Sequence, residues 1–111
     1  MRIESKVVGR YLVVKVLEPR LGADRAVNFK EAMWKFVDQG QKSLVLDLSS
    51  VEFIDSTGLG AILSVLKRMG TDGELLVSGA SDAVDSMFKL TRMNRIFRMF
   101  STVDNAISAP V

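Results

Sequence analysis

Apolar residues dominate two runs at the start of the chain, residues 3–8 and 11–17. Both runs are rich in β-branched residues, which favour strands. Gly9 and Arg10 separate them, and a two-residue connection with glycine first suits a type II′ turn. The second run, YLVVKVL, is apolar at nearly every position, which is typical of a strand covered on both faces. The pattern therefore predicts an N-terminal β-hairpin.

Three later segments place apolar residues at helical spacing. The first covers residues 23–39 and ends at Gly40, the second runs from Thr57 to about Met69, and the third begins at a cap formed by Ser81 or Asp82. The residues expected to face inward are Ala26, Phe29, Met33, Phe36 and Val37, then Leu59, Ile62, Leu63, Leu66 and Met69, and finally Val84, Met87 and Phe88. On a separate flank of the first helix, Val27 and Trp34 are expected to cover the edge of the core, with an exposed contact patch as the alternative.

Short apolar segments at residues 43–48 and 74–79 lie between the predicted helices and are interpreted as buried strands. Strands that alternate with helices imply parallel crossovers, and the hairpin adds an antiparallel pair. We therefore predict a single α/β domain over residues 1–111, with a mixed β-sheet opened by an N-terminal hairpin and helices packed against the sheet. The segment RIFRMF, residues 95–100, is compatible with an edge strand or with a helical turn.

The composition narrows the possible functions. The 111 residues include no cysteine and no histidine, which excludes disulfides and cysteine nucleophiles and removes the usual general base and zinc ligand. This weighs against a hydrolytic enzyme. A net charge of +2 is too small to imply nucleic acid binding, and the lack of a signal peptide or membrane-length apolar run predicts a cytoplasmic protein without a membrane partner. Basic residues recur late in the chain and indicate either a solvated face or a docking stripe: Lys89, Arg92, Arg95 and Arg98.

The stretch FIDSTGLG, residues 53–60, joins an apolar segment to the second predicted helix. Either Asp55 or Ser56 can be the N-cap of this helix, and Asp55 is preferred because a cap at Ser56 would lose a hydrophobic staple. Asp55 as the N-cap would accept the backbone N–H of Thr57 or Gly58. Ile54 and Leu59 would then form a hydrophobic staple, and Ser56 would be the first helical residue, facing solvent. The positive potential of the helix start would partly compensate a phosphoryl group on Ser56.

Other interpretations of this stretch are weaker. Gly58 and Gly60 begin like a dinucleotide-binding fingerprint, but Leu63 stands where the third glycine belongs. Ser56 has no histidine to activate it as a nucleophile, and Lys67 lies about three helical turns away. The simplest alternative is that the polar residues only build a tight strand-to-helix turn.

A resemblance to a known family rests on this stretch and its surroundings. The segments LVLDLSSVEFIDSTGLGAILSVLKRM (44–69) and GELLVSGAS (73–81) resemble the STAS domain family, and more narrowly bacterial anti-sigma factor antagonists. Weaker similarity extends to VDSMFKLTRMNRIF (84–97) and STVDNAI (101–107). The segment LEPRLGAD (17–24) departs from the family pattern. The family often has a glycine followed shortly by leucine and aspartate there, in a loop that neighbours a serine which is phosphorylated in the family.

The resemblance implies a phosphorylation switch. A partner anti-sigma factor, itself a serine kinase, would phosphorylate Ser56, with Thr57 as second candidate. The unphosphorylated chain would bind that kinase and release the sigma factor, and a serine phosphatase would reset it. ATP and magnesium would belong to the kinase, so the chain itself needs no cofactor or metal. The expected partner-binding residues are Asp55, Ser56, Thr57, Gly58, Leu59 and Gly60. The alternative within this family is a module that binds a nucleotide or other small ligand at the helix N-terminus after Asp55.

Overall fold

The N-terminal hairpin forms as predicted. In the computed structural model, which describes residues 1–110, β1 (Ile3–Val8) and β2 (Tyr11–Val16) pair antiparallel, with Val8 opposite Tyr11. Gly9 has φ +60°, and Arg92 is the only non-glycine residue with positive φ in the described part of the chain. Arg10 therefore does not adopt the left-handed conformation that a type I′ turn would require, which leaves the predicted type II′ turn.

A five-stranded mixed sheet forms the centre of the molecule. β4 (Ser43–Asp47) pairs parallel with β2 and with β6 (Glu74–Ser78), and β7 (Met99–Phe100) pairs parallel with β6. The strand order is β1-β2-β4-β6-β7. β2, β4 and β6 lie in the middle and are buried on both faces, which explains their continuous apolar sequences. The predicted α/β class and mixed sheet are confirmed.

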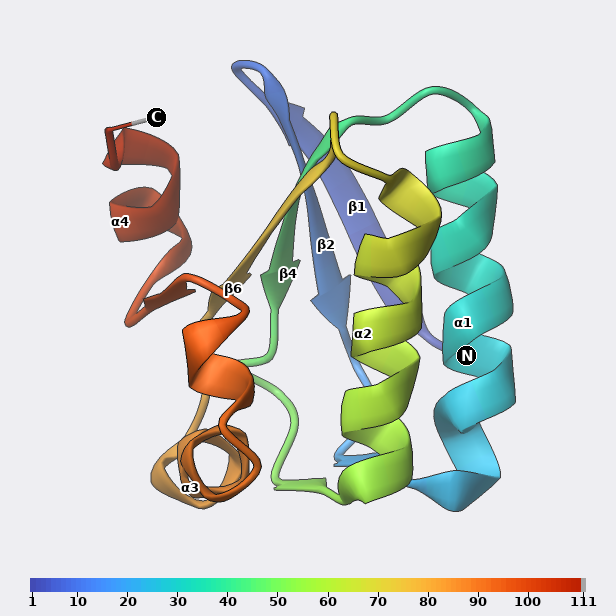
Figure 1. The fold of residues 1–111 in the computed structure, drawn as a ribbon, viewed down its shortest axis with the longest axis vertical. Helices are drawn as coiled ribbons and strands as arrows, with labels where there is room; N and C mark the ends of the chain where they lie inside the picture. The colour runs from blue at the N-terminus through green and yellow to red at the C-terminus, as the bar shows by residue number, and fades with distance from the viewer. Residues whose placement is uncertain (111) are drawn as a thin grey trace.

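Two long helices cover one face of this sheet. α1 (Ala23–Asp38) and α2 (Ser56–Met69) lie side by side in front of the strands, and both begin at the lower end of the molecule in Figure 1. α3 (Asp82–Leu90) lies at that same lower end. The main core lies between the sheet and these helices, and its largest fully buried side chains include Phe29, Met33, Leu46, Ile62 and Phe88.

The short helix α4 (Val103–Ser108) covers the opposite face. It adds a second cluster made of Tyr11, Val13, Val45, Leu76 and Ala106. The sequence pattern did not predict this helix, because six residues are too few to establish a helical period. Within residues 1–110 no helix is both long enough and apolar enough to cross a lipid bilayer.

The burial of α2 differs from the predicted stripe. Ala61 and Val65 are buried, whereas Leu63, Leu66 and Met69 are only half-buried. The reason is that α2 packs against α1 as well as the sheet, which widens and rotates the buried arc. On α1, Trp34 packs against the core edge as expected, but Val27 is 56% exposed, so that part of the prediction was wrong.

Two other segments were assigned incompletely from the sequence. In RIFRMF the edge-strand alternative holds for Met99 and Phe100, which form β7. Arg95 is the last residue of the preceding 3₁₀ turn η1 (Met93–Arg95), and residues 96–98 belong to neither element. Phe53 and Ile54, at the start of the stretch that joins the apolar segment to the second helix, form the two-residue strand β5 (Phe53–Ile54), which pairs parallel with β3 (Arg20–Leu21). A two-residue strand carries no alternation that a sequence pattern can reveal.

Candidate functional site

Asp55 begins α2 as its N-cap, in the predicted register. Its backbone is extended, with φ −113°, and its carboxylate accepts the backbone N–H of Gly58 at 3.0 Å. Ser56 is therefore the first residue of the helix, and it is exposed. Ile54 and Leu59 occupy the two staple positions, and both are buried in the main core. The buried pair fixes the direction in which the chain enters the helix.

The ladder of β3 and β5 brings a second helix start beside this one. Leu21 pairs with Ile54, and the next residue, Gly22, is the N-cap of α1. A Cβ built on Gly22 would lie only 2.9 Å from Oδ2 of Asp55. The backbone N–H of Ala23 also helps to lower the pKa of the Asp55 carboxyl. Asp55 thus lies between the amino ends of α1 and α2, and the segment LEPRLGAD lies directly beside the FIDSTGLG stretch.

The two glycines of the stretch have different surroundings. Gly58 is buried, and a Cβ there would lie 2.1 Å from the backbone oxygen of Leu21. The close packing of β3 against α2 therefore requires a glycine at position 58. This requirement does not depend on a binding partner. Gly60 is exposed, and a Cβ there would meet nothing within 4 Å. Open space for an approaching molecule therefore exists at Gly60 and not at Gly58.

The two hydroxyl groups at the helix start also differ. Thr57 Oγ1 donates a hydrogen bond to Oδ1 of Asp55 at 2.5 Å. The Ser56 hydroxyl forms no hydrogen bond with any residue in the described range 1–110, and its side chain is exposed. Ser56 therefore faces solvent as the predicted cap register implied, and its hydroxyl, unlike that of Thr57, has no hydrogen-bond partner in the described range.

The electrostatics of the site favour a charged Asp55. The hydrogen bond from Thr57 and the backbone N–H of Gly58 lower the pKa of the Asp55 carboxyl, more than desolvation raises it. The carboxylate is consequently ionised at neutral pH. Two helix amino ends, each carrying partial positive charge, surround it.

The best-formed hollows on the described part of the molecule lie away from the site. One is lined by residues of β1, β2, β4 and α4, and two are lined by residues between Ala80 and Ser101. None of them includes a residue of the stretch 55–60. Within residues 1–110 no cluster of three acidic side chains forms a candidate metal site.

The basic stripe predicted late in the chain does not form one helical face. Lys89 belongs to α3 and pairs with Asp85 at 3.0 Å, whereas Arg92 lies in the left-handed conformation just before η1. Arg98 stacks over the Phe100 ring, with 5.3 Å from its guanidinium carbon to the ring centroid. All four basic residues are exposed, and the assignment of the stripe as solvated surface or docking surface stays a prediction.

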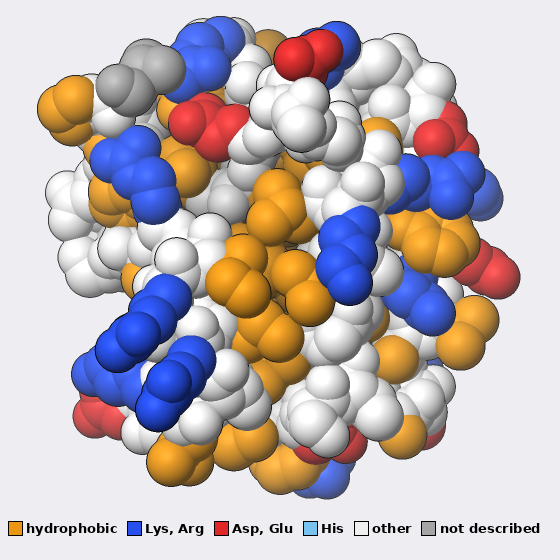
Figure 2. Space-filling model, viewed as in Figure 1, with side chains coloured by type: hydrophobic (Ala, Val, Ile, Leu, Met, Phe, Trp, Pro, Cys, Tyr) orange, Lys and Arg blue, Asp and Glu red, His pale blue; other side chains and the backbone are white. Residues whose placement is uncertain are grey.

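The face that carries α2 is apolar along its middle. Figure 2 shows a band of hydrophobic side chains running down this face, with Lys and Arg side chains on both sides of it. Partly buried apolar residues that pack against the core also include Leu63 and Leu66 of α2, Met87 of α3 and Met93 of η1. An exposed apolar band of this kind is suited to contact with another protein.

The fold and the site together define a small mixed α/β domain that presents an exposed, hydroxyl-bearing loop at the start of a helix. The chain belongs to the STAS domain family, whose model matches residues 2–106. The resemblance found in the sequence is confirmed over almost the whole chain.

Relatives with a described role lie within the same family. A Thermotoga maritima protein named "Putative anti-sigma factor antagonist" is 31% identical over 99 residues, which cover 86% of this chain and 87% of that protein. The "Anti-sigma-B factor antagonist" of Staphylococcus aureus is 26% identical, covering 89% of this chain and 92% of that protein.

Solved structures agree on the fold. The crystal structure of an anti-sigma factor antagonist from Mycobacterium paratuberculosis superposes with a TM-score of 0.88, at 24% identity, over 96% of this chain and 91% of that one. The Bacillus cell fate determinant SpoIIAA, solved in its phosphorylated form, gives a TM-score of 0.71 at 17% identity over 96% of each chain. At these identities the likeness establishes the fold alone.

Proposed function

We propose that this chain is an anti-sigma factor antagonist controlled by phosphorylation of Ser56. In the unphosphorylated form it binds an anti-sigma factor that is also a serine kinase, and this binding releases the sigma factor. Phosphorylation of Ser56 ends the binding, and a serine phosphatase restores it. The names of the relatives in the STAS family and the SpoIIAA structure solved in a phosphorylated form support this assignment.

The observation that carries the choice of Ser56 is the difference between the two hydroxyls. Thr57 donates its hydroxyl hydrogen to Asp55, whereas the Ser56 hydroxyl has no such partner in the described chain and is exposed. A kinase can therefore reach Ser56 without breaking a hydrogen bond that supports the helix start. Modification of Thr57 would remove one of the groups that hold the N-cap.

The effect of a phosphoryl group follows from its charge. It would add about −1.5 to −2 charges beside the ionised Asp55 carboxylate. The amino ends of α1 and α2 would offset part of that charge and so keep the fold intact. Because Ser56 makes no buried contact, the change would act on the docking surface alone. Like-charge repulsion and the cost of desolvating a phosphate would then oppose partner binding.

The proposed contact surface is the exposed part of the stretch, Ser56, Thr57 and Gly60, continued by the apolar band along α2 in Figure 2. Gly58 and Leu59 are buried, so in this proposal they shape the loop and do not touch the partner. Asp55 holds the two helix starts together. ATP and magnesium come with the kinase.

The test combines the purified chain with its cognate anti-sigma kinase and Mg-ATP. We expect one phosphate on Ser56 by mass spectrometry, and retained modification in Thr57→Val but none in Ser56→Ala. Label on neither Ser56 nor Thr57 would refute the switch, and label on Thr57 alone would refute the assignment to Ser56.

Binding measurements separate charge from shape at the same position. Ser56→Asp and Ser56→Asn differ by one charge at almost the same size. We expect Ser56→Asp to bind the kinase at least about tenfold more weakly than Ser56→Asn, with both variants folded as judged by thermal unfolding. Calorimetry with nucleotides and no partner tests the small-ligand alternative, and saturable binding that Asp55→Ala abolishes would favour that alternative.

A further inference from the structure

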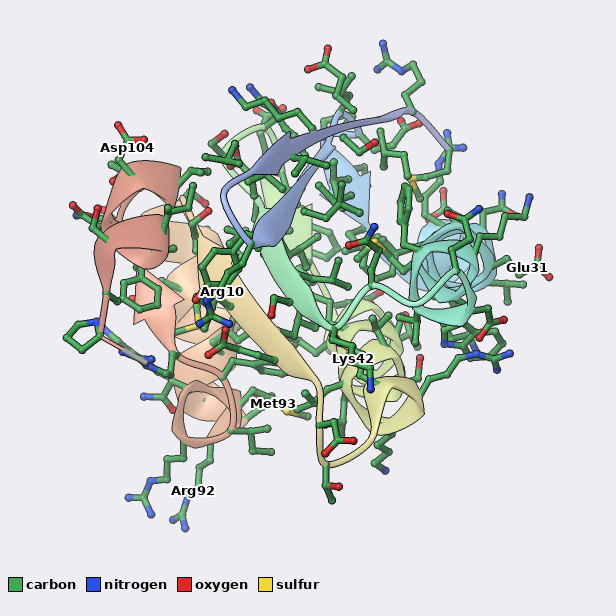
Figure 3. The ribbon with its side chains drawn as sticks, turned by 90° about the horizontal axis from the view of Figure 1, so that it is seen from above. Arg10, Glu31, Lys42, Arg92, Met93 and Asp104 are labelled. Atoms are coloured by element: carbon green, nitrogen blue, oxygen red, sulfur yellow. The ribbon has the colours of Figure 1, made fainter. Side chains whose placement is uncertain are left out.

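The outer strand β1 has one edge without a partner strand. It is the first strand of the sheet order, and it pairs with β2 alone. Figure 3, seen from above, shows β1 along the outer side of the sheet. All six residues of β1 pair with β2 in an unbroken register. The strand is therefore regular, long enough to template another strand, and contains neither proline nor a bulge to prevent it.

The hydrogen bonds of the hairpin show which backbone groups of β1 are free. The N–H of Leu17 donates to the oxygen of Arg2 at 2.9 Å, which makes this a hydrogen-bonded pair of the ladder. In an antiparallel ladder hydrogen-bonded and non-hydrogen-bonded pairs alternate. Glu4, Lys6 and Val8 therefore bond to β2, whereas the N–H and C=O groups of Ile3, Ser5 and Val7 point away from it.

The side chains of this strand are symmetric about Ser5. Glu4 and Lys6 carry opposite charges on either side of it, and Ile3 and Val7 are apolar on either side of those. Val7 is 71% exposed. Neither Glu4 nor Lys6 forms an ion pair within the described chain. Such a pattern is complementary to its own copy in the reverse direction.

We propose that β1 pairs antiparallel with β1 of a second copy of this chain, around a twofold axis at Ser5. In this register Ser5 faces Ser5, Ile3 faces Val7, and all three free residues of each strand form hydrogen-bonded pairs. Glu4 of each copy faces Lys6 of the other. The two sheets join into one continuous sheet through the self-complementary edge.

Charge selects this register over its neighbours. A shift of the twofold axis to Glu4 would place the two Glu4 carboxylates opposite each other, and a shift to Lys6 would do the same with two ammonium groups. Like charges directly opposite on neighbouring strands are destabilising. Both shifts also leave fewer of the free backbone groups paired within the strands. With the twofold axis at Ser5, no like charges face each other and the free backbone groups of Ile3, Ser5 and Val7 are all paired.

The two faces of the joined sheet fit the same register. Ile3 pairs across the hairpin with Val16 on the helix-covered side, so the contact between Ile3 and the second copy's Val7 extends the apolar surface there. On the other side Lys15 lies opposite Glu4 within the hairpin. A row Lys15, Glu4 and the second copy's Lys6 then alternates in charge across three strands.

This contact is small, so the dimer is weak and depends on concentration and ionic strength. Ser56 follows the separate β3–β5 ladder as the first residue of α2 and is not part of the β1 edge. Dimerisation can therefore be tested without a kinase. A failure of either proposal does not affect the other.

Substitutions that reverse the charge of Glu4 or Lys6 test this dimer. Association of the full chain is measured by sedimentation at concentrations from about 10 µM to about 1 mM. The wild type is expected to dimerise reversibly. Glu4→Lys alone and Lys6→Glu alone each place like charges opposite in the homodimer, and each is expected to weaken association by at least about tenfold.

The same two variants make a sharper prediction together. A Glu4→Lys chain carries two cations on β1 and a Lys6→Glu chain carries two anions, so an equal mixture is expected to form a one-to-one heterodimer. The double variant Glu4→Lys, Lys6→Glu is expected to restore the homodimer. Glu31→Lys and Lys35→Glu are matched controls on exposed positions of α1, where Glu31 points into solvent in Figure 3, and both are expected to dimerise as the wild type does.

A backbone variant tests the edge itself. The N–H of Ser5 points away from β2, so Ser5→Pro preserves the bonds of the hairpin while it removes a donor at the centre of the proposed contact. We expect it to remain folded, by circular dichroism, and monomeric. If Ser5→Pro does not fold, the charge-reversal variants at Glu4 and Lys6 still test whether the chain dimerises through β1. A wild type that stays monomeric to 1 mM, or a dimer that Glu4→Lys and Lys6→Glu leave unchanged, would overturn the proposal.

Discussion

The Thr57 hydroxyl and the Asp55 carboxylate form a 2.5 Å hydrogen bond across the first turn of α2. The same carboxylate oxygen accepts the Gly58 N–H. One side chain thus satisfies a backbone donor at the helix start and also fixes the neighbouring hydroxyl. This leaves Ser56 as the free hydroxyl in the proposed site.

Replacement of Asp55 separates capping from charge. Asp55→Ala removes the N-cap acceptor and is expected to lower the free energy of unfolding by about 1 kcal/mol. Asp55→Asn keeps an acceptor oxygen and is expected to fall between Asp55→Ala and the wild type. Urea unfolding measures the difference, and equal stability of the alanine variant and the wild type would contradict the capping role.

Acid destabilisation should depend on the same carboxyl. The pKa of Asp55 is lowered in the folded chain, first by the Thr57 hydroxyl and then by the Gly58 N–H. A lowered folded pKa means that this contribution is present above the unfolded pKa and is lost as the pH falls through the folded pKa. The wild type is therefore expected to lose stability below about pH 4, and Asp55→Asn to lose less.

The comparison that tests this is the change in unfolding free energy between pH 6 and pH 2.5 for the two proteins. Asp38→Asn provides an independent case, because the Arg68 hydrogen bond lowers the pKa of Asp38. An Asp55→Asn variant with the full acid dependence of the wild type would show that the Asp55 carboxyl does not contribute.

The two glycines of α2 should respond in opposite directions to alanine. Gly58→Ala would force a Cβ against the Leu21 backbone oxygen and is expected to destabilise the chain by about 2 to 3 kcal/mol or more. Gly60→Ala adds a methyl group to open space within the helix and is expected to stabilise it by up to about 1 kcal/mol. The midpoints of urea unfolding of Gly58→Ala and Gly60→Ala, compared with the wild type, measure the two effects. Similar changes in stability at both positions would contradict this packing.

Trp34 should report the contact between α1 and α2. The guanidinium carbon of Arg68 lies 4.5 Å from the centroid of the Trp34 ring. Two hydrogen bonds from the guanidinium to the Asp38 carboxylate, of 3.0 and 2.9 Å, hold Arg68 in this position. Arg68→Ala is expected to expose the ring and shift its emission to longer wavelength, and Asp38→Ala to do so less. Trp34 is the only tryptophan, so the signal is unambiguous.

Lys67→Ala is the matched control for that experiment, because Lys67 is exposed on the same turn of α2. Its emission spectrum should equal that of the wild type. A similar red shift in Lys67→Ala would mean that any loss of charge on α2 affects Trp34, and that the stacking of Arg68 is not the cause.

Local patterns predicted the elements whose signals are contained within a few residues. Asp55 identified the cap, because a carboxylate followed three residues later by a free N–H is a local geometry. Gly9 identified the hairpin turn for the same reason. The long apolar runs of β2, β4 and β6 identified buried strands. The register of that cap also predicted that Ser56 faces solvent, and the family resemblance added the expectation that Ser56 is phosphorylated.

Features that arise between distant segments were not predictable in this way. The ladder of β3 and β5 joins residues 20–21 to residues 53–54, and neither piece is long enough to show a period. The same ladder places the Leu21 oxygen where it requires a glycine at position 58. The burial of Val65 depends on the contact of α2 with α1, which the helical spacing of α2 alone does not contain.

The sequence by itself determined the N-terminal hairpin, the buried strands β4 and β6, the three longer helices, the capped start of α2 and the membership of the STAS family. These depend on neighbouring residues and on a continuous motif. Tertiary structure decided which glycine is required by packing and which strand edge stays open. Each of these depends on where the rest of the chain ends up, because burial and hydrogen bonding are settled by segments that meet only after folding.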